Sequence, residues 1–591
     1  MNSKNDSLAD VSTSISRTQS VSSPMDSSNT LTMSVSRGSQ EIPLIEDTLA
    51  VFFDAMVETV PDNDALVACH QNVRLTYRQL QLESQRLASA LLRIGVERGD
   101  RVGIWSHNNT EWLLMQLATA RAGIILVNIN PAYRVSELEY ALNKVGCKAI
   151  VTMTSFKTSD YLDMLRTLAP ELNHCVPGQL QAARLPTLRT VVHLGTDELP
   201  GMLRFSDLIA SGDSADPQLA LIGATLQATD AINIQFTSGT TGFPKGATLT
   251  HRNILNNGFF IGEAMRLTAQ DRLCIPVPLY HCFGMVLGNL ACLTHGATIV
   301  YPNDGFDALS VLEAVQSERC TGLHGVPTMF IAELDHPRFA EFDLSTLRTG
   351  IMAGSPCPTE IMKRVVRDMH MEQVTIAYGM TETSPVSCQS LTDSPQAKRV
   401  STVGQVHPHL EVKMVDAESG EIVPIGVTGE LCTRGYVVMQ GYWDDLPKTQ
   451  EAIDADGWMH TGDLATMDSE GYVNIVGRIK DMVIRGGENI YPREIEEFLY
   501  RHPAVQDVQV VGVPDAKYGE ELCAWVILRP GQSVDEEGLR AFCNGQIAYY
   551  KVPRYIRFVD GFPMTVTGKI QKFKIREAMK EALNINEVDT A

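Results

Sequence analysis

Hydrophobic positions between residues 45 and 153 alternate between two periods. Stretches with the three-to-four residue spacing of an amphipathic helix are separated by short apolar runs that are typical of buried strands. Strands that alternate with helices predict parallel sheets covered by helices on both faces. The expected helices are 75–95, 110–123 and 136–146, and the expected strands are 101–106, 124–129 and 148–153.

The same alternation of helix and strand patterns is found between residues 272 and 379, after a glycine-rich segment at 237–246. It predicts that the chain from about 44 to 479 forms one large α/β domain with that segment in its middle. The expected strands are 272–278, 297–301, 321–326, 347–354 and 374–379, and the expected helices are 285–294, 306–316 and 358–369.

Beyond residue 400 the pattern changes twice. Short strands punctuated by glycine predict a small β-rich subdomain, and a compact α+β region follows Arg478. We therefore expect a smaller, mobile C-terminal domain over 480–591, with a hinge near 480. The strands of the subdomain are 411–416, 428–435 and 471–478; the C-terminal region has helices 494–502 and 534–547 and strands 505–513 and 521–529.

The N-terminal segment differs from the rest in composition. Residues 1–40 hold 13 Ser and 4 Thr and no aromatic residue, so they bury too little apolar surface to offset the entropy of ordering. We expect residues 1–43 to be a disordered tail. A mitochondrial transit peptide is the rival interpretation, but such peptides avoid acids, and we expect a cytoplasmic protein. The acids Asp6, Asp10 and Asp26 equal the basic residues Lys4, Arg17 and Arg37 in number.

Composition and charge exclude several classes of function. The 591 residues carry 49 Lys and Arg against 70 Asp and Glu, a net charge of −21, which argues against a nucleic-acid partner. The 12 cysteines form no C-x-x-C pair, so neither a disulfide framework nor a zinc site is expected. No run of about 18 uninterrupted apolar residues predicts an integral membrane segment. The oligomeric state stays open.

The segment 237–246, TSGTTGFPKG, has the composition of a polyphosphate-binding loop. Its glycines allow backbone N–H groups to approach an anion closely, its hydroxyls donate hydrogen bonds, and Lys245 supplies positive charge. The phosphate loop of P-loop NTPases needs Gly-Lys-Ser/Thr, whereas here the lysine precedes the glycine. The candidate nucleotide-binding residues are Thr237, Ser238, Gly239, Thr240, Thr241, Gly242 and Lys245.

A second group of candidates lies at the end of the strand expected at 374–379. Ligands bind at the carboxyl ends of strands in open α/β sheets. There Tyr378 offers a ring for adenine stacking, Gly379 and Thr381 follow, and Glu382 offers a hard oxygen ligand for Mg²⁺.

A third group lies in the β-rich region. Asp463 follows a glycine in WMHTGD, and a carboxylate there can pair with both hydroxyls of a ribose. Arg478 in GRIKD can bridge ribose oxygens and phosphate. Alone, each of these residues reads as an ordinary turn or surface residue.

These motifs, in this order, resemble the signature of the adenylate-forming superfamily of acyl-CoA synthetases, luciferases and peptide-synthetase adenylation domains. Four further segments carry the resemblance: 278–285 with His281, 350–356 with Gly354 and Ser355, 486–497 with Gly486 and Gly487, and 563–572 with Lys569. The chain most resembles the medium- and long-chain fatty acyl-CoA ligases, over about 45–580.

The resemblance implies an ATP-dependent activation of a carboxylic acid to acyl-AMP, followed by transfer to coenzyme A. Lys569 would contact the carboxylate and the α-phosphate, His281 would orient the carboxylate, and Lys245 would bind the triphosphate. Mg²⁺ would be held by Glu382 and Thr241. Gly354 and Ser355 would line the adenine site, and Gly486 and Gly487 the thiol tunnel, after rotation about a hinge at Lys480.

Three other functions share these motifs. The chain could load a carrier protein instead of coenzyme A, act as a luciferase-like oxygenase, or bind nucleotide without catalysis. The intact set of charged motif residues argues against a non-catalytic regulator. The acyl group is not readable from sequence, although Val326, Pro327, Met329 and Met352 are candidates for its pocket.

Overall fold

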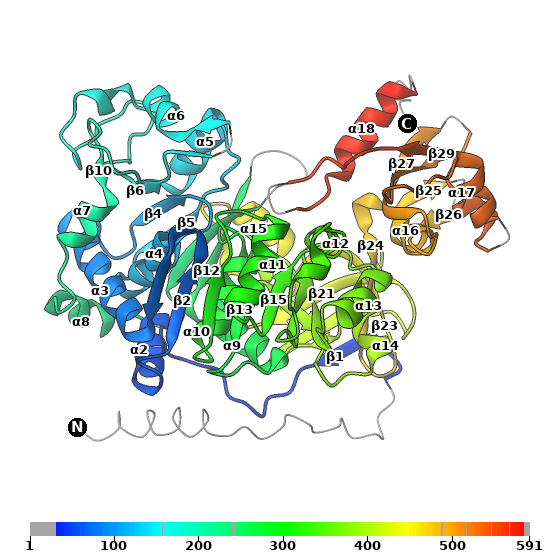
Figure 1. The fold of residues 1–591 in the computed structure, drawn as a ribbon, viewed down its shortest axis with the longest axis horizontal. Coiled ribbons are helices and arrows are strands. Elements are labelled where there is room, and N and C mark those ends of the chain that lie inside the picture. The colour runs from blue at the N-terminus through cyan, green and yellow to red at the C-terminus, as the bar shows by residue number, and fades with distance from the viewer. Residues whose placement is uncertain are drawn as a thin grey trace.

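The computed structural model arranges the chain as a large body of sheets and helices with a smaller α+β unit at its C-terminal end (Figure 1). The fold class expected from the sequence is confirmed. The structure describes residues 31–156, 158–237, 244–485, 488–515, 517–544, 546–565 and 568–583.

The first large sheet has eight strands, of which six run parallel and the last two, β12 and β22, are antiparallel to their neighbours. At the antiparallel end, β11 and β12 pair with each other on either side of the glycine-rich segment. The order is β10 (Leu203–Arg204), β9 (Thr190–His193), β6 (Cys147–Thr152), β4 (Arg101–Trp105), β5 (Ile125–Asn128), β11 (Ala231–Thr237), β12 (Lys245–Thr250) and β22 (Gly441–Tyr442).

The second large sheet has nine strands with a parallel centre and antiparallel edges. Its middle strands end at the motifs that the sequence singled out. The order is β19 (Gln405–Val406), β18 (Val386–Gln389), β17 (Gln373–Gly379), β16 (Thr349–Ala353), β15 (Gly322–Gly325), β13 (Arg272–Cys274), β14 (Thr298–Tyr301), β2 (Asp64–Ala68) and β3 (Val73–Thr76).

Helix α4 (Thr110–Ala122) is buried on almost every side, which is typical of a helix enclosed within a core. Its residues share one apolar cluster with strands of both large sheets. The expected helices 75–95, 110–123 and 136–146 are confirmed as α3, α4 and α5. Besides α4, the α-helices of this body are α2 (Leu49–Thr59), α3 (Tyr77–Arg93), α5 (Val135–Val145), α6 (Tyr161–Leu168), α7 (Phe205–Ala210), α8 (Pro217–Gly223), α9 (His251–Met265), α10 (Ala291–Leu293), α11 (Ala308–Ser317), α12 (Pro327–Leu334), α13 (Thr359–Asp368), α14 (Gln396–Arg399) and α15 (Leu446–Ala452). The helix expected at 285–294 begins as a π-helix, Phe283–Leu290, that continues into α10.

The β-rich region forms an antiparallel five-stranded sheet, and its outer strand corrects one expectation. Residues 35–37, expected within the disordered tail, form β1 and pair with β20 along the sheet edge. The reason is local: Ser34 is buried, and its backbone exchanges hydrogen bonds with Val423 and Met414. Residues 1–30 lie outside the described residues. The order is β1 (Val35–Arg37), β20 (Leu410–Val415), β21 (Gly429–Gly435), β23 (Met459–Met467) and β24 (Val473–Arg478).

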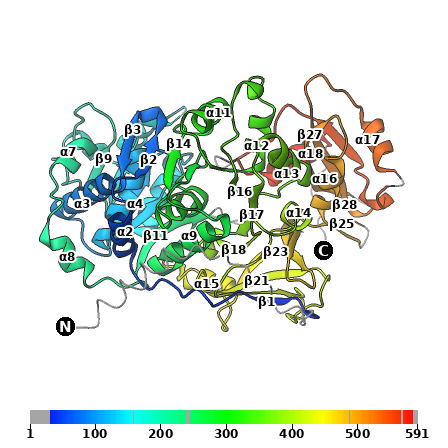
Figure 2. The same cartoon turned by 60° about the horizontal axis from the view of Figure 1, so that its bottom comes forward.

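The C-terminal unit has its own sheet and its own apolar clusters. A long hairpin of β27 and β28 forms its centre, and helix α18 packs on β27. Figure 2 shows this unit beside α12 and α13 at one end of the molecule. Its elements are β25 (Val483–Arg485), β26 (Glu488–Ile490), α16 (Pro492–Leu499), β27 (Val505–Asp515), β28 (Gly519–Leu528), α17 (Glu536–Cys543), β29 (Tyr555–Phe558) and α18 (Lys572–Ala582).

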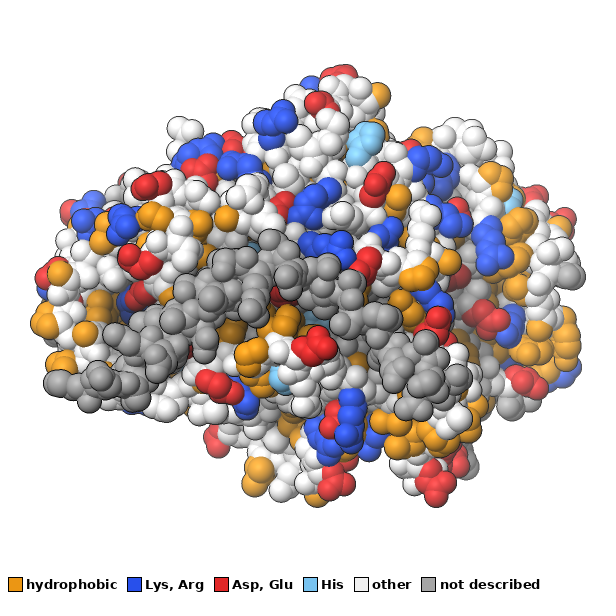
Figure 3. Space-filling view, turned by 90° about the horizontal axis from the view of Figure 1, so that it is seen from below, with side chains coloured by type: hydrophobic (Ala, Val, Ile, Leu, Met, Phe, Trp, Pro, Cys, Tyr) orange, Lys and Arg blue, Asp and Glu red, His pale blue; other side chains and the backbone are white. Residues whose placement is uncertain are grey.

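Acidic and basic side chains are interspersed with apolar ones on the face seen in Figure 3. Within the described part of the chain, no helix is long and apolar enough to cross a membrane.

Candidate active site

Lys245 is the first residue of β12 and lies directly opposite Thr237, the last residue of β11. The Thr237 hydroxyl donates a hydrogen bond to the carbonyl of Lys245 at 3.4 Å. The register of this strand pair therefore fixes the positions of Thr237 and Lys245 on either side of the glycine-rich segment. Ser238, Gly239, Thr240, Thr241 and Gly242 lie outside the described residues, so their roles stay predictions.

Glu382 is a buried carboxylate beside the ammonium group of Lys245, and a tyrosine joins the two. The hydroxyl of Tyr442 donates to Glu382 Oε1 at 2.8 Å and accepts from Lys245 Nζ at 3.0 Å. Sequence reasoning missed Tyr442, which follows a glycine in an unremarkable loop sequence. Only the pairing of β22 with β12 brings it into the site.

Tyr378, Gly379 and Thr381 lie at the carboxyl end of β17, as the sequence predicted. A β-bulge interrupts the pairing with β18 between Tyr378 and Gly379. A Cβ atom on Gly379 would lie 1.7 Å from the carbonyl oxygen of Pro385, so only glycine fits there. The backbones of Gly379 and Pro385 therefore approach each other closely at the point where the strand ends.

Asp463 and Arg478 are directly opposite each other in the β23–β24 pair. Arg478 Nε donates to Asp463 Oδ1 at 3.0 Å, and the hydroxyl of Tyr378 donates to Asp463 Oδ2 at 2.7 Å. Three residues that are distant in sequence thus meet at one carboxylate. The two motifs thus meet as a cross-strand pair, a kind of contact that sequence spacing cannot reveal.

The turn before Asp463 is held by Glu430, which sequence reasoning also missed. Glu430 Oε1 accepts from the backbone N–H of Gly462 at 3.0 Å, and Oε2 lies 2.9 Å from Nδ1 of His460. The thiol of Cys432 lies 3.5 Å from the same nitrogen. These three side chains have the ligand types of a metal site, but their hydrogen bonds already account for the shape of the turn.

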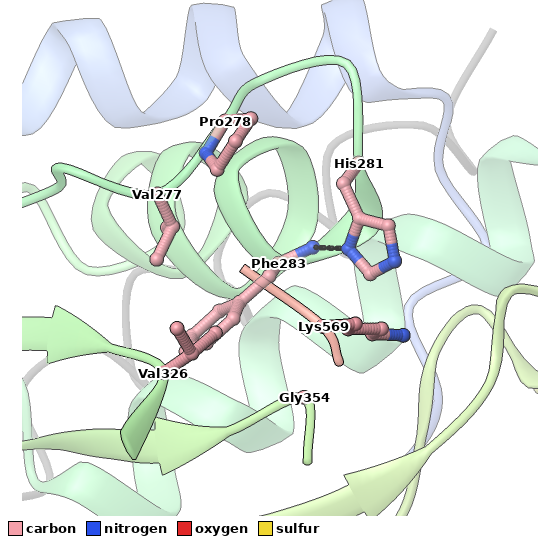
Figure 4. Close-up of a pocket in the computed structure, with 7 residues that line it drawn as sticks. All are labelled: Val277, Pro278, His281, Phe283, Val326, Gly354 and Lys569. Atoms are coloured by element: carbon pink, nitrogen blue, oxygen red, sulfur yellow. Dashed lines mark hydrogen bonds between the residues drawn. The ribbon is translucent and has the colours of Figure 1, made fainter. Parts of the chain in front are cut away.

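Lys569 reaches from the C-terminal unit into a narrow, mainly apolar cavity of the large body (Figure 4). The site residues His281 and Gly354 line the same cavity, and Lys569 Cε lies 3.9 Å from the position of a Cβ on Gly354. The remaining lining residues are Val277, Pro278, Phe283 and Val326. The structure therefore brings Lys569 together with two motifs that lie more than 200 residues before it in the sequence.

The cavity changes the protonation of its two basic groups. Burial, and then the positive charge of Lys569, lowers the pKa of His281 to about 3. Burial, and then the charge of Arg478, lowers the pKa of Lys569 below its ordinary value. His281 is therefore neutral at physiological pH, which suits a hydrogen-bonding role rather than a charged one.

The expected acyl pocket stays a prediction, and only one of its four candidate residues lines this cavity. Val326 lines the cavity, but Pro327, Met329 and Met352 are not among its lining residues. Met352 packs in a different apolar cluster from its neighbours Ile351 and Ala353, because alternate residues of β16 face opposite sides of the sheet.

Of the last four candidates, two lie among the described residues and two do not. Gly354 lines the cavity with a φ of +90°, a conformation that favours glycine. Ser355 follows it, and its carbonyl accepts from the thiol of Cys357 at 3.5 Å. Gly486 and Gly487 lie outside the described residues.

Comparison with known families decides the classification. The family model described as AMP-binding enzyme matches residues 53–443, and that of the AMP-binding enzyme C-terminal domain matches residues 494–569. The chain belongs to the AMP-binding enzyme family. The first match holds the residues around the β11–β12 pair and the end of β17, and the second ends at Lys569.

Relatives of this AMP-binding enzyme match it over nearly their whole length. YngI of Bacillus subtilis (strain 168) is 51% identical over 92% of this chain and 99% of its own. The medium-chain acyl-CoA ligase ACSF2, mitochondrial, of Bos taurus is 48% identical over 93% of this chain and 90% of its own.

Solved structures agree with the fold of this AMP-binding enzyme. The anthranilate CoA ligase AuaEII in complex with anthranoyl-AMP gives a TM-score of 0.80 at 26% identity, covering 92% of this chain and 99% of that one. ATP-bound MatB from Rhodopseudomonas palustris gives 0.77 at 30% identity, covering 90% and 99%.

Proposed function

We propose that this protein is an AMP-forming acyl-CoA ligase that acts on medium-chain fatty acids. The observation that carries the proposal is the position of Lys569, which enters the cavity beside His281 from a separate sheet-containing unit. A buried lysine beside a neutral histidine is suited to bind the anionic end of a ligand. The medium-chain assignment rests on the ACSF2 relatives.

The chemical difficulty of the first half-reaction is to bring two anions together. A carboxylate oxygen attacks the α-phosphate of ATP, acyl-AMP forms, and pyrophosphate leaves. Lys569 would stabilise the charge that develops between carboxylate and α-phosphate, and neutral His281 would orient the carboxylate. Asp463 and Arg478 would bind the ribose, and Tyr378 would stack on the adenine.

The residues present fit a divalent cation next to the triphosphate. Glu382 offers a hard carboxylate oxygen, and Lys245 lies close enough to share the phosphate charge. When bound, Mg²⁺ would neutralise phosphate charge. Glu382 would hold it, with Thr241 as the second ligand expected from sequence.

The second half-reaction would need another arrangement of the C-terminal unit. The coenzyme A thiol attacks the acyl carbon of acyl-AMP, and AMP leaves. In our proposal the unit that starts near residue 480 rotates about Lys480, which withdraws Lys569 and brings Gly486 and Gly487 to the thiol path. Contacts such as that of Gln506 with Asp335, at 3.1 Å, would break in this rotation.

The test measures both half-reactions over a panel of acids. ATP–pyrophosphate exchange with straight-chain acids of 2 to 18 carbons is expected to be fastest for medium chains. AMP release that depends on free coenzyme A, without a carrier protein, is expected for the second step. Release only with a carrier protein would overturn the coenzyme A assignment, and exchange with no acid would overturn the ligase.

The compartment is a separate proposal. The charge balance of residues 1–40 supports a cytoplasmic location, whereas the ACSF2 relatives are named as mitochondrial proteins. Fractionation of cells that express the full chain, with immunodetection, decides between the two.

A further inference from the structure

We infer that Tyr442 is a positioning residue that holds Lys245 and Glu382 apart and ready for MgATP. The inference rests on the roles proposed above for those two residues. Tyr442 touches neither substrate nor metal in this role; it acts through its two charged neighbours.

The backbone places Tyr442 next to Lys245. Strand β22 pairs antiparallel with β12, and Tyr442 lies directly opposite Ala247. Lys245 and Ala247 are two residues apart on β12, so their side chains share a face, and Tyr442 is the diagonal neighbour of Lys245 on that face. A further bond from the backbone N–H of Tyr442 to the hydroxyl of Thr449, at 2.9 Å, fixes this short strand.

The phenol satisfies both charged groups at once. A tyrosine hydroxyl has one proton to donate and lone pairs to accept with. It donates to Glu382 Oε1 at 2.8 Å and accepts from Lys245 Nζ at 3.0 Å, and both bonds are charge-assisted. The ammonium group also lies 4.1 Å from the centroid of the ring.

This arrangement keeps two opposite charges available. Glu382 is 5% exposed, and a carboxylate buried to this degree requires a hydrogen-bond donor. The Lys245 ammonium is bonded to the same hydroxyl, so without the phenol it could pair with Glu382 directly. A direct ion pair between them would neutralise the cation that faces the phosphates and the oxygen that faces the metal. The hydroxyl satisfies each group and leaves its charge in place.

Tyr442→Phe tests the inference, because it removes the hydroxyl and keeps the ring. Calorimetric binding of MgATP and of AMP is measured separately, since AMP lacks the β- and γ-phosphates. We expect MgATP binding to weaken about 10-fold or more, the range for a lost hydrogen bond to a charged group, while AMP binding stays within about 2-fold. The free Mg²⁺ needed for half-maximal pyrophosphate exchange should rise as well.

Tyr436→Phe is the matched control. It lies six residues earlier, is equally buried, and loses a hydroxyl bonded at 3.5 Å to the neutral amide of Asn257. It should change neither binding constant. The double variant Tyr442→Phe/Glu382→Gln should bind MgATP only slightly more weakly than Glu382→Gln alone. In both proteins the carboxylate that Tyr442 holds apart from Lys245 has already been removed.

Three outcomes would overturn the inference. Tyr442→Phe could bind MgATP as the wild type does, although Lys245→Ala and Glu382→Gln lose it; the proposed function would then stand without a role for Tyr442. MgATP and AMP binding could weaken equally, which indicates general damage to the site. Finally, Lys245→Ala and Glu382→Gln could themselves bind MgATP normally, in which case the proposed roles of those two residues fail first.

Discussion

Replacing Lys569 with alanine should separate the two half-reactions. Its ammonium enters the cavity that His281 and Gly354 line, and its Cε lies 3.9 Å from the Cβ position of Gly354. A carboxylate and an α-phosphate that meet there would lie within contact distance of Nζ. Because the cavity is mainly apolar, little water can replace the lost charge.

The size of the effect follows from the electrostatics of such a site. Two unit charges about 4 Å apart interact by about 4 kcal/mol when the effective dielectric constant is 20, and solvation of the free lysine offsets part of this. Loss of one preorganised donor to a developing charge typically slows a reaction by about 10²- to 10³-fold. We expect a loss of that size in acyl-AMP formation.

The assay compares ATP–pyrophosphate exchange with thioester formation from synthetic acyl-AMP and coenzyme A. Only the first should fall in Lys569→Ala. Lys574→Ala, which removes a lysine from the same unit with its Nζ 6.0 Å from the Phe573 ring, is the control and should leave both rates unchanged. Equal loss of both half-reactions in a folded Lys569→Ala protein would refute the reasoning.

Three further predictions address other parts of the structure. Asp463→Asn keeps the shape of the side chain but loses the charge that meets Arg478; AMP binding measured by calorimetry should weaken about 10-fold or more, and unchanged binding would remove Asp463 from the ribose site. Buried histidines, such as His407 with its pKa lowered to about 3, stay neutral in the folded chain while the unfolded chain binds protons below pH 6.5. The melting temperature should therefore fall between pH 7 and pH 5, and less steeply in His407→Gln; equal slopes would contradict this. Gln506→Ala removes the contact with Asp335 and should slow acyl-AMP formation by about 2- to 5-fold without slowing thioester formation, and exposed Gln532→Ala should change neither.

Periodicity predicted the elements well because most helices have one apolar face and most central strands are buried on both. The helix α4 shows the limit of this reasoning: its sequence predicts a helix, but only the structure shows that it is enclosed on nearly every side. The error at β1 has a similar cause. Its residues are polar, and they are ordered by pairing with β20, which is almost 400 residues away.

The residues of the candidate site also fall into two groups: those that the sequence reveals and those that only the structure reveals. Residues that form motifs with their sequence neighbours, such as Lys245, Glu382 and Asp463, are visible in the sequence. Tyr442 and Glu430 are not, because each acts on a motif that belongs to a different segment. No local spacing encodes a diagonal contact across two strands.

The outer position of β1 has a consequence for how this chain can be shortened. Because residues 1–40 have the composition of a disordered tail, a truncation near residue 40 is an obvious way to shorten the chain. Such a truncation would also remove β1, the strand that covers the edge of β20. An open edge presents unpaired backbone N–H and C=O groups that other chains can bind, a recognised route to aggregation. The connecting residues also join this edge to α9, where the backbone of Ile45 exchanges two hydrogen bonds with the side chain of Asn256. Poor solubility of a protein cut at residue 40 would thus reflect an uncovered sheet edge and not a defect in the active site.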